Sequence, residues 1–428
     1  MVSVAKRWGL RVESDTGLGS RYLLDMVMTE QQVRSEVRQW LSHNWDETTV
    51  RSEWIETVTD SGWAAPSWPV EWLGKGLDSS LSGVVASEFA RVGAYGTGHD
   101  KTNLWANTLL SFGSNELKSA LLRDLMLGSI NMCLLYSEPG AGSDLAGVQT
   151  RAERDGDEWI VTGQKVWTSG ARMADYALLI ARTDLDAPKH RGISFFWFPM
   201  DQPGVEVRPL RQATGDSRFN EVFLTEARVP HANMLGEQNN GWMVLQTALA
   251  YERSVMGESQ RRRSTGEENK AVRSAGDENP APIPDLSLVA LAQDTGSSQD
   301  PIIRQRIAQL YCMVTVNDWN NRRAKAEMAQ GTSSSAMSLG KLAMSQILHT
   351  AASIQTSILG AEAMTGGEDS PRAADAAYSL LNAFFTSIGG GTDQIQRNII
   401  GERILGLPKE PEIDKTIPFR EVLRSPSR

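Results

Sequence analysis

A glutamate on an otherwise apolar helix face is the first candidate for chemistry in this sequence. In the run from Gly241 to Met256, helical spacing surrounds Glu252 with apolar side chains, namely Leu245, Ala248, Leu249, Val255 and Met256. A carboxylate in such surroundings loses hydration, which raises its pKa toward the range of a general base. For this segment alone, an ordinary helix glutamate paired with an arginine is the alternative interpretation.

Two earlier segments combine hydroxyl groups with glycines or with an aromatic ring. Residues 134–144 read Leu-Leu-Tyr-Ser-Glu-Pro-Gly-Ala-Gly-Ser-Asp, where glycines allow close backbone approach and Ser137 and Ser143 offer hydroxyls. In residues 163–170, Trp167 and Ser169 share one face if the segment is a strand. These groups suit a flat heteroaromatic ligand or a phosphate. Taken alone, each segment favours a structural interpretation, a tight loop for the first and a buried core tryptophan for the second.

A third segment, residues 387–397, reads Ser-Ile-Gly-Gly-Gly-Thr-Asp-Gln-Ile-Gln-Arg. Three glycines run into a predicted helix that has Thr392 as its N-cap. The exposed backbone N–H groups at such a helix start suit a pyrophosphate or an oxyanion, and a plain helix–helix turn is the alternative.

Three successive regions of the chain, each with its own composition, form the elements that position these segments. From Thr29, the expected N-cap of the first helix, to about residue 127, apolar residues recur at helical spacing. Short runs rich in β-branched and aromatic residues then predict strands, with Asp155-Gly156 as a hairpin turn; they are 158–161, 177–181, 193–198 and 222–224. The last composition is helical again, with long segments at 307–328, 339–363 and 373–388.

This order predicts an α+β fold in which the strands form a separate module, because strands and helices do not alternate as in a doubly wound sheet. The expected division is an extension at 1–27, an N-terminal helical domain at 28–129, a central β domain at 130–235, a C-terminal helical domain at 236–412 and a peripheral tail at 413–428. The polar residues 260–285 predict a mobile surface loop.

Bulk composition narrows the classes of partner. The 428 residues carry a net charge of −9, which argues against nucleic acid or an anionic membrane as the main partner. No stretch approaches 18 consecutive apolar residues, so no membrane span is expected. Cys133 and Cys312 lack the spacing of a disulfide framework or a metal site. We therefore expect a cytoplasmic protein without a bound metal.

Taken together, the segments at 134–144, 163–170 and 387–397 resemble the acyl-CoA dehydrogenase family of flavoproteins, and the likeness extends over roughly residues 29–407. The resemblance implies an N-terminal helical domain, a central β-barrel-like domain and a C-terminal four-helix bundle, with FAD between the last two and across a subunit interface. The implied reaction is FAD-dependent α,β-dehydrogenation of an acyl-CoA thioester to a trans-2-enoyl-CoA, in lipid or steroid side-chain β-oxidation.

The resemblance also implies roles for individual residues. The expected FAD contacts are Leu134, Tyr136, Ser137, Trp167 and Ser169 beside the flavin ring, and Thr392 and Gln394 at the adenosine end. Ser143 would contact the bound CoA thioester or the flavin.

One departure from the common pattern decides which residue is the expected base. Many family members carry the catalytic glutamate immediately before the Gly-Thr of the last motif, where this sequence has Gly390. A minority, isovaleryl-CoA dehydrogenase and several actinobacterial enzymes among them, place it on the first helix of the C-terminal domain before an arginine, as Glu252 precedes Arg253 here. The resemblance therefore implies that Glu252 removes the α-proton, with Arg253 beside the substrate. The Gly390 amide would bind the thioester carbonyl.

Two further departures concern the adenosine end of FAD and the oligomer. An arginine beside a Phe-Gly pair, common in the family, is missing from 291–296, and a glutamine before a Gly-Gly turn is replaced around 357–361. Some actinobacterial relatives form two-plus-two heterotetramers with unequally shared flavin sites. We therefore expect a homotetramer or such a heterotetramer, with an electron-transfer flavoprotein as electron acceptor. A catalytically silent partner subunit and a flavin oxidase or monooxygenase remain open as alternatives.

Overall fold

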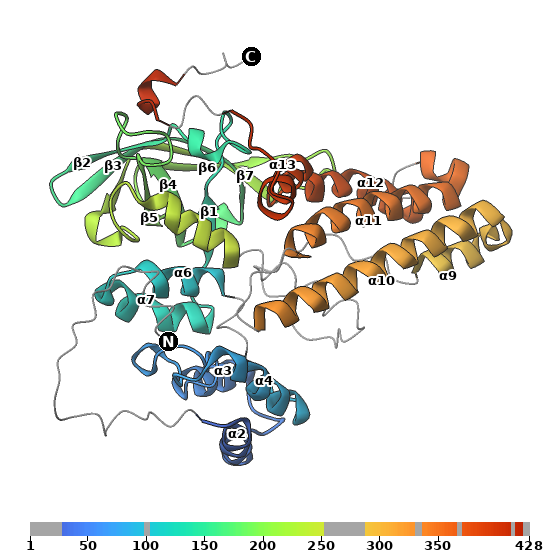
Figure 1. Cartoon of the computed structure of the whole chain (residues 1–428), viewed down its shortest axis with the longest axis horizontal. Helices are drawn as coiled ribbons and strands as arrows, with labels where there is room; N and C mark the ends of the chain where they lie inside the picture. The colour runs from blue at the N-terminus through green and yellow to red at the C-terminus, as the bar shows by residue number, and fades with distance from the viewer. Residues whose placement is uncertain are drawn as a thin grey trace.

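The computed structural model describes residues 28–97, 103–251, 287–329, 336–365, 370–411 and 416–422. A group of helices, a curled sheet and a second group of helices follow one another along the chain (Figure 1). This arrangement confirms the predicted α+β fold class with its helical, β and helical parts. The predicted extension at 1–27 and the predicted loop at 260–285 lie outside the described residues.

The N-terminal helices are α2 (Glu30–Asn44), α3 (Arg51–Asp60), α4 (Ser82–Arg91), α6 (Leu104–Phe112) and α7 (Asn115–Leu127). Thr29 caps α2 as predicted, because its hydroxyl accepts a hydrogen bond from the Gln32 amide while the Gln32 side chain accepts one from the Thr29 amide. The helical spacing read from the sequence places Val33, Val37 and Leu41 on the buried face of α2. Local capping and the apolar stripe therefore agree on where this helix begins and how it faces.

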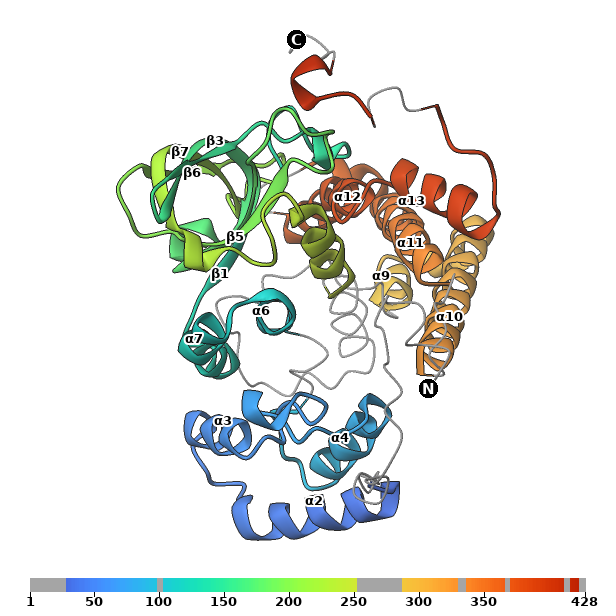
Figure 2. The same cartoon turned by 60° about the vertical axis from the view of Figure 1, so that its left-hand side comes forward.

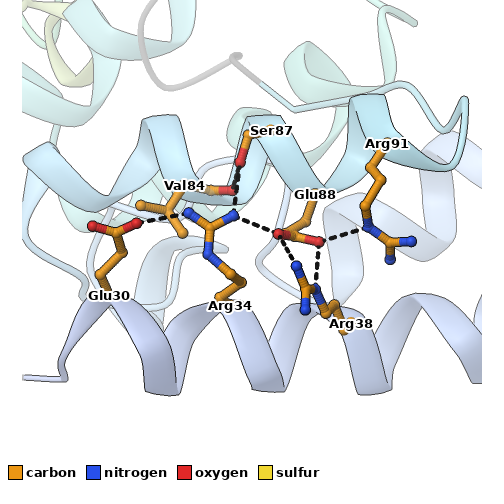
Figure 3. Close-up of polar contacts among 7 residues, drawn as sticks. All are labelled: Glu30, Arg34, Arg38, Val84, Ser87, Glu88 and Arg91. Atoms are coloured by element: carbon orange, nitrogen blue, oxygen red, sulfur yellow. Dashed lines mark hydrogen bonds and ion pairs between the residues drawn. The ribbon is translucent and has the colours of Figure 1, made fainter.

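A buried carboxylate joins α2 to α4 (Figure 3). Glu88 on α4 is 1% exposed and accepts hydrogen bonds from Arg38 at 2.7 Å and from Arg91 at 2.9 Å, and it also pairs with Arg34. The hydrogen bond from Arg38, with those of Arg91 and Arg34, lowers the pKa of the Glu88 carboxyl to about 2, against the opposing effect of burial. The cluster stabilises the packing of the two helices, and the sequence analysis did not single it out.

The central domain is built from seven strands, β1 (Met132–Leu135), β2 (Arg151–Asp155), β3 (Glu158–Ser169), β4 (Tyr176–Arg182), β5 (Ile193–Pro199), β6 (Val205–Leu210) and β7 (Phe219–Pro230). Strands β2, β3, β7 and β6 form an antiparallel run. Strand β4 pairs in parallel with β1 and antiparallel with β5, and one bridge between Arg151 and Arg182 links it to β2. The sheet therefore consists of two parts that meet at the end of β4.

The sequence predicted four of these strands, and β1, β2 and β6 were missed. Strand β2 reads Arg-Ala-Glu-Arg-Asp, so only Ala152 in it is buried and the apolar signal is almost absent. The predicted turn at Asp155-Gly156 is confirmed: Asp155 pairs with Glu158, and Gly156 has a φ of +61°.

The C-terminal helices follow a helix that the structure describes over residues 241–251. They are α9 (Ser287–Asp294), α10 (Pro301–Ala329), α11 (Ala336–Leu359), α12 (Pro371–Ile388) and the short α13 (Asp393–Ile399). Figure 2 shows α12 beside the sheet and α10 on the far side of α11, and Figure 1 shows the helix at 241–251 between the sheet and α6. None of the helices in the described ranges is long and apolar enough to cross a membrane.

Part of the predicted tail packs on the central domain through one buried side chain. In residues 416–422 a single turn, Phe419–Glu421, docks on the central domain, and the Phe419 side chain is buried. A lone phenylalanine in a polar segment gave no periodic signal in the sequence, so only the tertiary contact reveals it.

Candidate active site

The loop of residues 136–144 is held to strand β3 by a buried ion pair. The Lys165 side chain is fully buried, and its ammonium donates to the Glu138 carboxylate at 2.9 Å and to the Tyr136 carbonyl at 3.1 Å. The Glu138 carboxylate also accepts from the amides of Gln149 at 2.7 Å and Thr150 at 2.9 Å. Burial alone would raise the pKa of Glu138, but Lys165 and the two amides outweigh it and hold this pKa below the ordinary value.

Strand β3 presents Trp167 and Ser169 on one exposed face, as the sequence predicted. The Trp167 side chain is 57% exposed although it is a large aromatic residue, while Thr168 between the two is buried. Trp167 has a φ of +64°, and the register with β7 shifts between Lys165 and Thr168. A non-glycine residue in this left-handed region is strained, and such strain persists where surrounding contacts impose it, commonly at functional sites.

A backbone hydrogen bond joins the first motif to the strand of Trp167. The Val166 amide donates to the Ser137 carbonyl at 2.9 Å, so the predicted flavin-contacting loop and the strand of Trp167 are directly joined. Leu134, three residues before Ser137, lies on β1 and is half-buried. The Tyr136 ring, by contrast, packs into the core against Phe195, with 5.8 Å between ring centroids. The structure therefore brings Ser137 together with Trp167 and Ser169, while the Tyr136 side chain belongs to the core.

An aromatic row connects this face to the C-terminal helices. The Trp167 ring meets Phe219 edge-on at 5.9 Å between centroids, and Phe219 contacts Phe385 on α12 at 5.6 Å. The chain after α12 contains the predicted glycine turn, in which Gly390 and Gly391 have φ values of +65° and +87°. The row thus places the third sequence motif next to the second, although about two hundred residues separate them in the chain.

The predicted N-cap at Thr392 is confirmed, because its hydroxyl accepts a hydrogen bond from the Ile395 amide at 3.1 Å. A polar network behind this turn fixes the start of α13. The Asp393 carboxylate accepts from Ser345 at 2.8 Å and from Lys341 at 3.2 Å. Gln394 is exposed, so its side chain is available to a ligand or a neighbouring subunit.

These residues fit the FAD that the sequence led us to expect. The exposed Trp167 ring offers a flat aromatic surface, and the Ser169 hydroxyl stands on the same face of the strand. An aromatic plane flanked by hydroxyls and bare glycine backbone is a donor set suited to an isoalloxazine ring.

The predicted base and one predicted substrate-binding residue lie outside the described residues. These are Glu252 and Arg253, which follow the described helix at 241–251. The part of the apolar stripe that the structure describes is confirmed: Leu245 and Ala248 are buried, and Leu249 packs against the same core. The described helix, up to residue 251, therefore has the apolar face from which the sequence analysis predicted a poorly hydrated Glu252 carboxylate.

A cavity of about 400 Å³ opens beside the first motif. Its walls come from both the central and the C-terminal domain and include Ser143, Asp144, Lys189, His190, Trp242 and Ile395. The Lys189 ammonium lies 3.2 Å from both carboxylate oxygens of Asp144, and the His190 ring meets Trp242 edge-on at 4.8 Å. The lining thus combines a Lys189–Asp144 ion pair, a hydroxyl and two rings, which suits a polar heteroaromatic group.

Of the cavity residues, the sequence analysis identified only Ser143. Lys189, His190 and Trp242 were missed, because they come from a loop and from a helix start with no motif of their own. The Lys-His-Arg run at 189–191 was the one available signal, and without the fold it is indistinguishable from a solvated basic turn.

Three family models together match most of the chain. They are described as acyl-CoA dehydrogenase, N-terminal domain, at residues 23–129, middle domain, at 133–226, and C-terminal domain, at 288–405. The chain is 33% identical to "Acyl-CoA dehydrogenase IpdE1" of Mycolicibacterium smegmatis, over 89% of this chain and 98% of the relative. It is 36% identical to "Acyl-CoA dehydrogenase FadE34" of Mycobacterium tuberculosis, over 82% of this chain and 46% of the relative.

Two solved structures have a similar fold and 28% sequence identity. "Tcur3481-Tcur3483 steroid ACAD" has a TM-score of 0.66 and is covered to 98%, with 89% of this chain aligned. The ChsE4-ChsE5 complex from Mycobacterium tuberculosis has a TM-score of 0.60 with the same coverage of both chains.

Proposed function

This chain belongs to the acyl-CoA dehydrogenase family, and we propose that it oxidises a bulky, ring-bearing acyl-CoA thioester with Glu252 as its catalytic base. The activity itself is the FAD-dependent α,β-dehydrogenation of an acyl-CoA to a trans-2-enoyl-CoA. The observation that carries the proposal for the site is the union of the Ser137 loop, the exposed Trp167 face and the Gly390 turn described above.

The reaction needs a proton acceptor at Cα and a donor at the thioester carbonyl. Glu252 takes the α-proton, and an apolar setting like that of Leu245 and Ala248 makes a carboxylate more basic. The Gly390 amide donates to the carbonyl oxygen and stabilises the developing enolate, which a glycine supplies without a side chain. FAD, when bound, accepts the hydride that leaves Cβ.

Seven residues would hold the cofactor. Trp167 and Ser169 supply one wall, the segment from Leu134 through Tyr136 to Ser137 supplies the edge, and Thr392 and Gln394 face the adenosine end. Exposure supports Trp167, Ser169 and Gln394 in these roles. Tyr136 would act by fixing this edge, because its carbonyl accepts a hydrogen bond from Lys165 and its ring is in the core.

The cavity beside Ser143 suits the nucleotide end of CoA. The Lys189 cation attracts a phosphate, and the rings of His190 and Trp242 offer surfaces to an adenine. Arg253 adds a second cation near the substrate. This assignment leaves the acyl chain to enter between the Trp167 face and the helix that leads to Glu252.

A bulky substrate and a heteromeric assembly are the finer parts of the proposal. Gly390 removes the side chain that other family members place beside the thioester, which leaves room for a ring system. The two structures with 28% identity are named as a steroid ACAD and as a complex of two proteins. We therefore propose a steroid-like acyl group, a two-plus-two tetramer, an electron-transfer flavoprotein as acceptor, and a cytoplasmic location.

Anaerobic reduction of the bound flavin tests the activity and the substrate class together. The purified holoprotein is mixed with acyl-CoA thioesters that carry straight, branched or steroid side-chain acyl groups, and flavin absorbance is recorded. We expect ring-bearing thioesters to bleach the flavin of the wild type, while Glu252→Gln keeps its FAD and stays oxidised. Equal bleaching of the variant would exclude Glu252, and faster bleaching by straight chains would exclude the bulky substrate.

A catalytically silent partner subunit is the second candidate, favoured by the missing FAD-binding residues around 291–296 and 357–361. Purification of this chain alone separates the two candidates. A yellow protein that is bleached by substrate supports the enzyme, whereas a colourless chain that restores activity to a flavin-bearing partner supports the silent subunit.

A further inference from the structure

One buried arginine ties together the two loops that line the Ser143 cavity. Arg182, at the end of β4, is 1% exposed. Its guanidinium donates to the Lys189 carbonyl at 2.6 Å on one side. On the other side it donates to the Ala146 carbonyl at 2.6 Å and to the Val148 carbonyl at 3.3 Å. The planar fork of arginine is suited to spanning two strands of backbone in this way.

These bonds fix the cavity from behind. Ala146 follows Ser143 and Asp144, which form one wall, and the Lys189 carbonyl belongs to the residue whose ammonium forms the other. The Lys189–Asp144 ion pair closes the same two loops at the front. The spacing between the walls therefore depends on the Arg182 guanidinium together with the Lys189–Asp144 ion pair.

The C-terminal segment covers that guanidinium. The Phe419 ring lies 3.7 Å from the Arg182 Cζ, in a cation–π contact, and the ring is 2% exposed. The Phe419 amide donates to the Ala187 carbonyl at 3.0 Å and the Arg420 amide to the Leu185 carbonyl at 3.1 Å. The Arg420 side chain pairs with Asp186. All three contacts fall on the loop that continues into Lys189 and His190.

We propose that Arg182 and Phe419 are positioning residues for the CoA nucleotide, and that the C-terminal segment 416–422 is a working part of the substrate site. The segment lies beyond the C-terminal family model, which ends at residue 405, so the matched family region does not account for it. This inference rests on the proposed function, because it assigns the Ser143 cavity to the nucleotide end of the substrate.

The decisive test compares a complete substrate with one that lacks the nucleotide. The KM and kcat of the holoprotein are measured with an acyl-CoA and with the matching acyl-pantetheine thioester. Phe419→Ala removes the ring, and Arg420→Ala weakens the docking from an exposed position without opening the core. For Phe419→Ala we expect the KM for acyl-CoA to rise about tenfold with kcat retained, since one charge-assisted contact sets that scale. The KM for acyl-pantetheine should stay within a factor of two.

Binding of adenosine 3′,5′-bisphosphate, followed by calorimetry, supplies a readout independent of turnover. Its Kd should rise by a similar factor in Phe419→Ala and by a smaller one in Arg420→Ala. Glu421→Gln, an exposed residue on the same turn, is the matched control and should bind as the wild type does.

Three results would overturn the inference: equal losses with both thioesters, an unchanged Kd in Phe419→Ala, or a wild type that does not bind the nucleotide. A wild type that binds the nucleotide but oxidises no thioester refutes the proposed activity instead. In that case the change in Kd between wild type and Phe419→Ala still decides the positioning role.

Discussion

Replacing Glu138 by glutamine should destabilise the central domain strongly, because it leaves the Lys165 ammonium buried without its counter-charge. In the wild type the Glu138 carboxylate accepts from Lys165 at 2.9 Å and from two backbone amides. A glutamine can satisfy one amide through its oxygen, but its NH2 group faces other donors. With its oxygen in the place of Oε1, the glutamine would still accept from Lys165 and from the Thr150 amide, but its NH2 group would face the Gln149 amide and Lys165 would lose its counter-charge.

The expected magnitude follows from the burial of the pair. Removing one partner of a buried ion pair costs about 3–5 kcal/mol, since the remaining charge has lost its compensation. The variant Glu138→Gln should lose this much free energy of unfolding at pH 7. The double variant Glu138→Gln/Lys165→Met removes the stranded charge as well and should recover part of the loss.

Urea denaturation, monitored by near-UV circular dichroism, measures these free energies for the wild type, for Glu138→Gln, for Lys165→Met and for the double variant. The pH dependence has a definite sign. The pKa of Glu138 is held below its ordinary value of 4.5, so its contribution is complete above pH 4.5 and disappears as the pH falls through the lowered pKa. The difference between wild type and Glu138→Gln should shrink accordingly. A loss below about 0.5 kcal/mol in Glu138→Gln, or a double variant as unstable as the two single changes summed, would refute the reasoning.

Two further changes probe other parts of the molecule. Glu88→Gln should lower the free energy of unfolding by about 1–2 kcal/mol at pH 7, less than the lowered pKa implies, because Arg38 and Arg91 are half-exposed and screened by solvent. This difference in unfolding free energy between wild type and Glu88→Gln is complete above pH 4.5, the ordinary pKa of this carboxyl, and vanishes as the pH falls through about 2. Glu30→Gln, at the exposed rim of the cluster, is the control in urea denaturation. Gly390→Ala places a side chain at a φ of +65°, so displacement of the amide should lower kcat about 100-fold or more. The absorbance spectrum should show that FAD stays bound. An unchanged kcat would remove the Gly390 amide from the mechanism.

The sequence predicted the features that depend on local pattern. Thr29 and Thr392 cap their helices, because capping is set by neighbours in the chain. Trp167 and Ser169 are both exposed, as the strand pattern predicted. The order of helical, β and helical parts followed from the change of hydrophobic period for the same reason.

The features that were missed depend on contacts between distant segments. Arg182 lies at the end of an apolar strand, where it reads as an ordinary strand terminus, and its partners at Ala146, Lys189 and Phe419 come from three separate loops. Tyr136 was expected at the flavin through the family motif, but the packing of its ring against Phe195 follows from the curl of the sheet. Periodicity carries no information about either arrangement.

Proton abstraction by Glu252 is most directly tested by hydrogen exchange at Cα. The substrate analogue is an acyl-CoA whose β-carbon is replaced by sulfur, so that no hydride can leave, and exchange of its α-hydrogens with D2O is followed by NMR in the presence of holoprotein. The wild type should catalyse this exchange, and Glu252→Gln should slow it by about 100-fold or more with FAD and the analogue still bound. Exchange by Glu252→Gln at the wild-type rate would show that another group removes the proton.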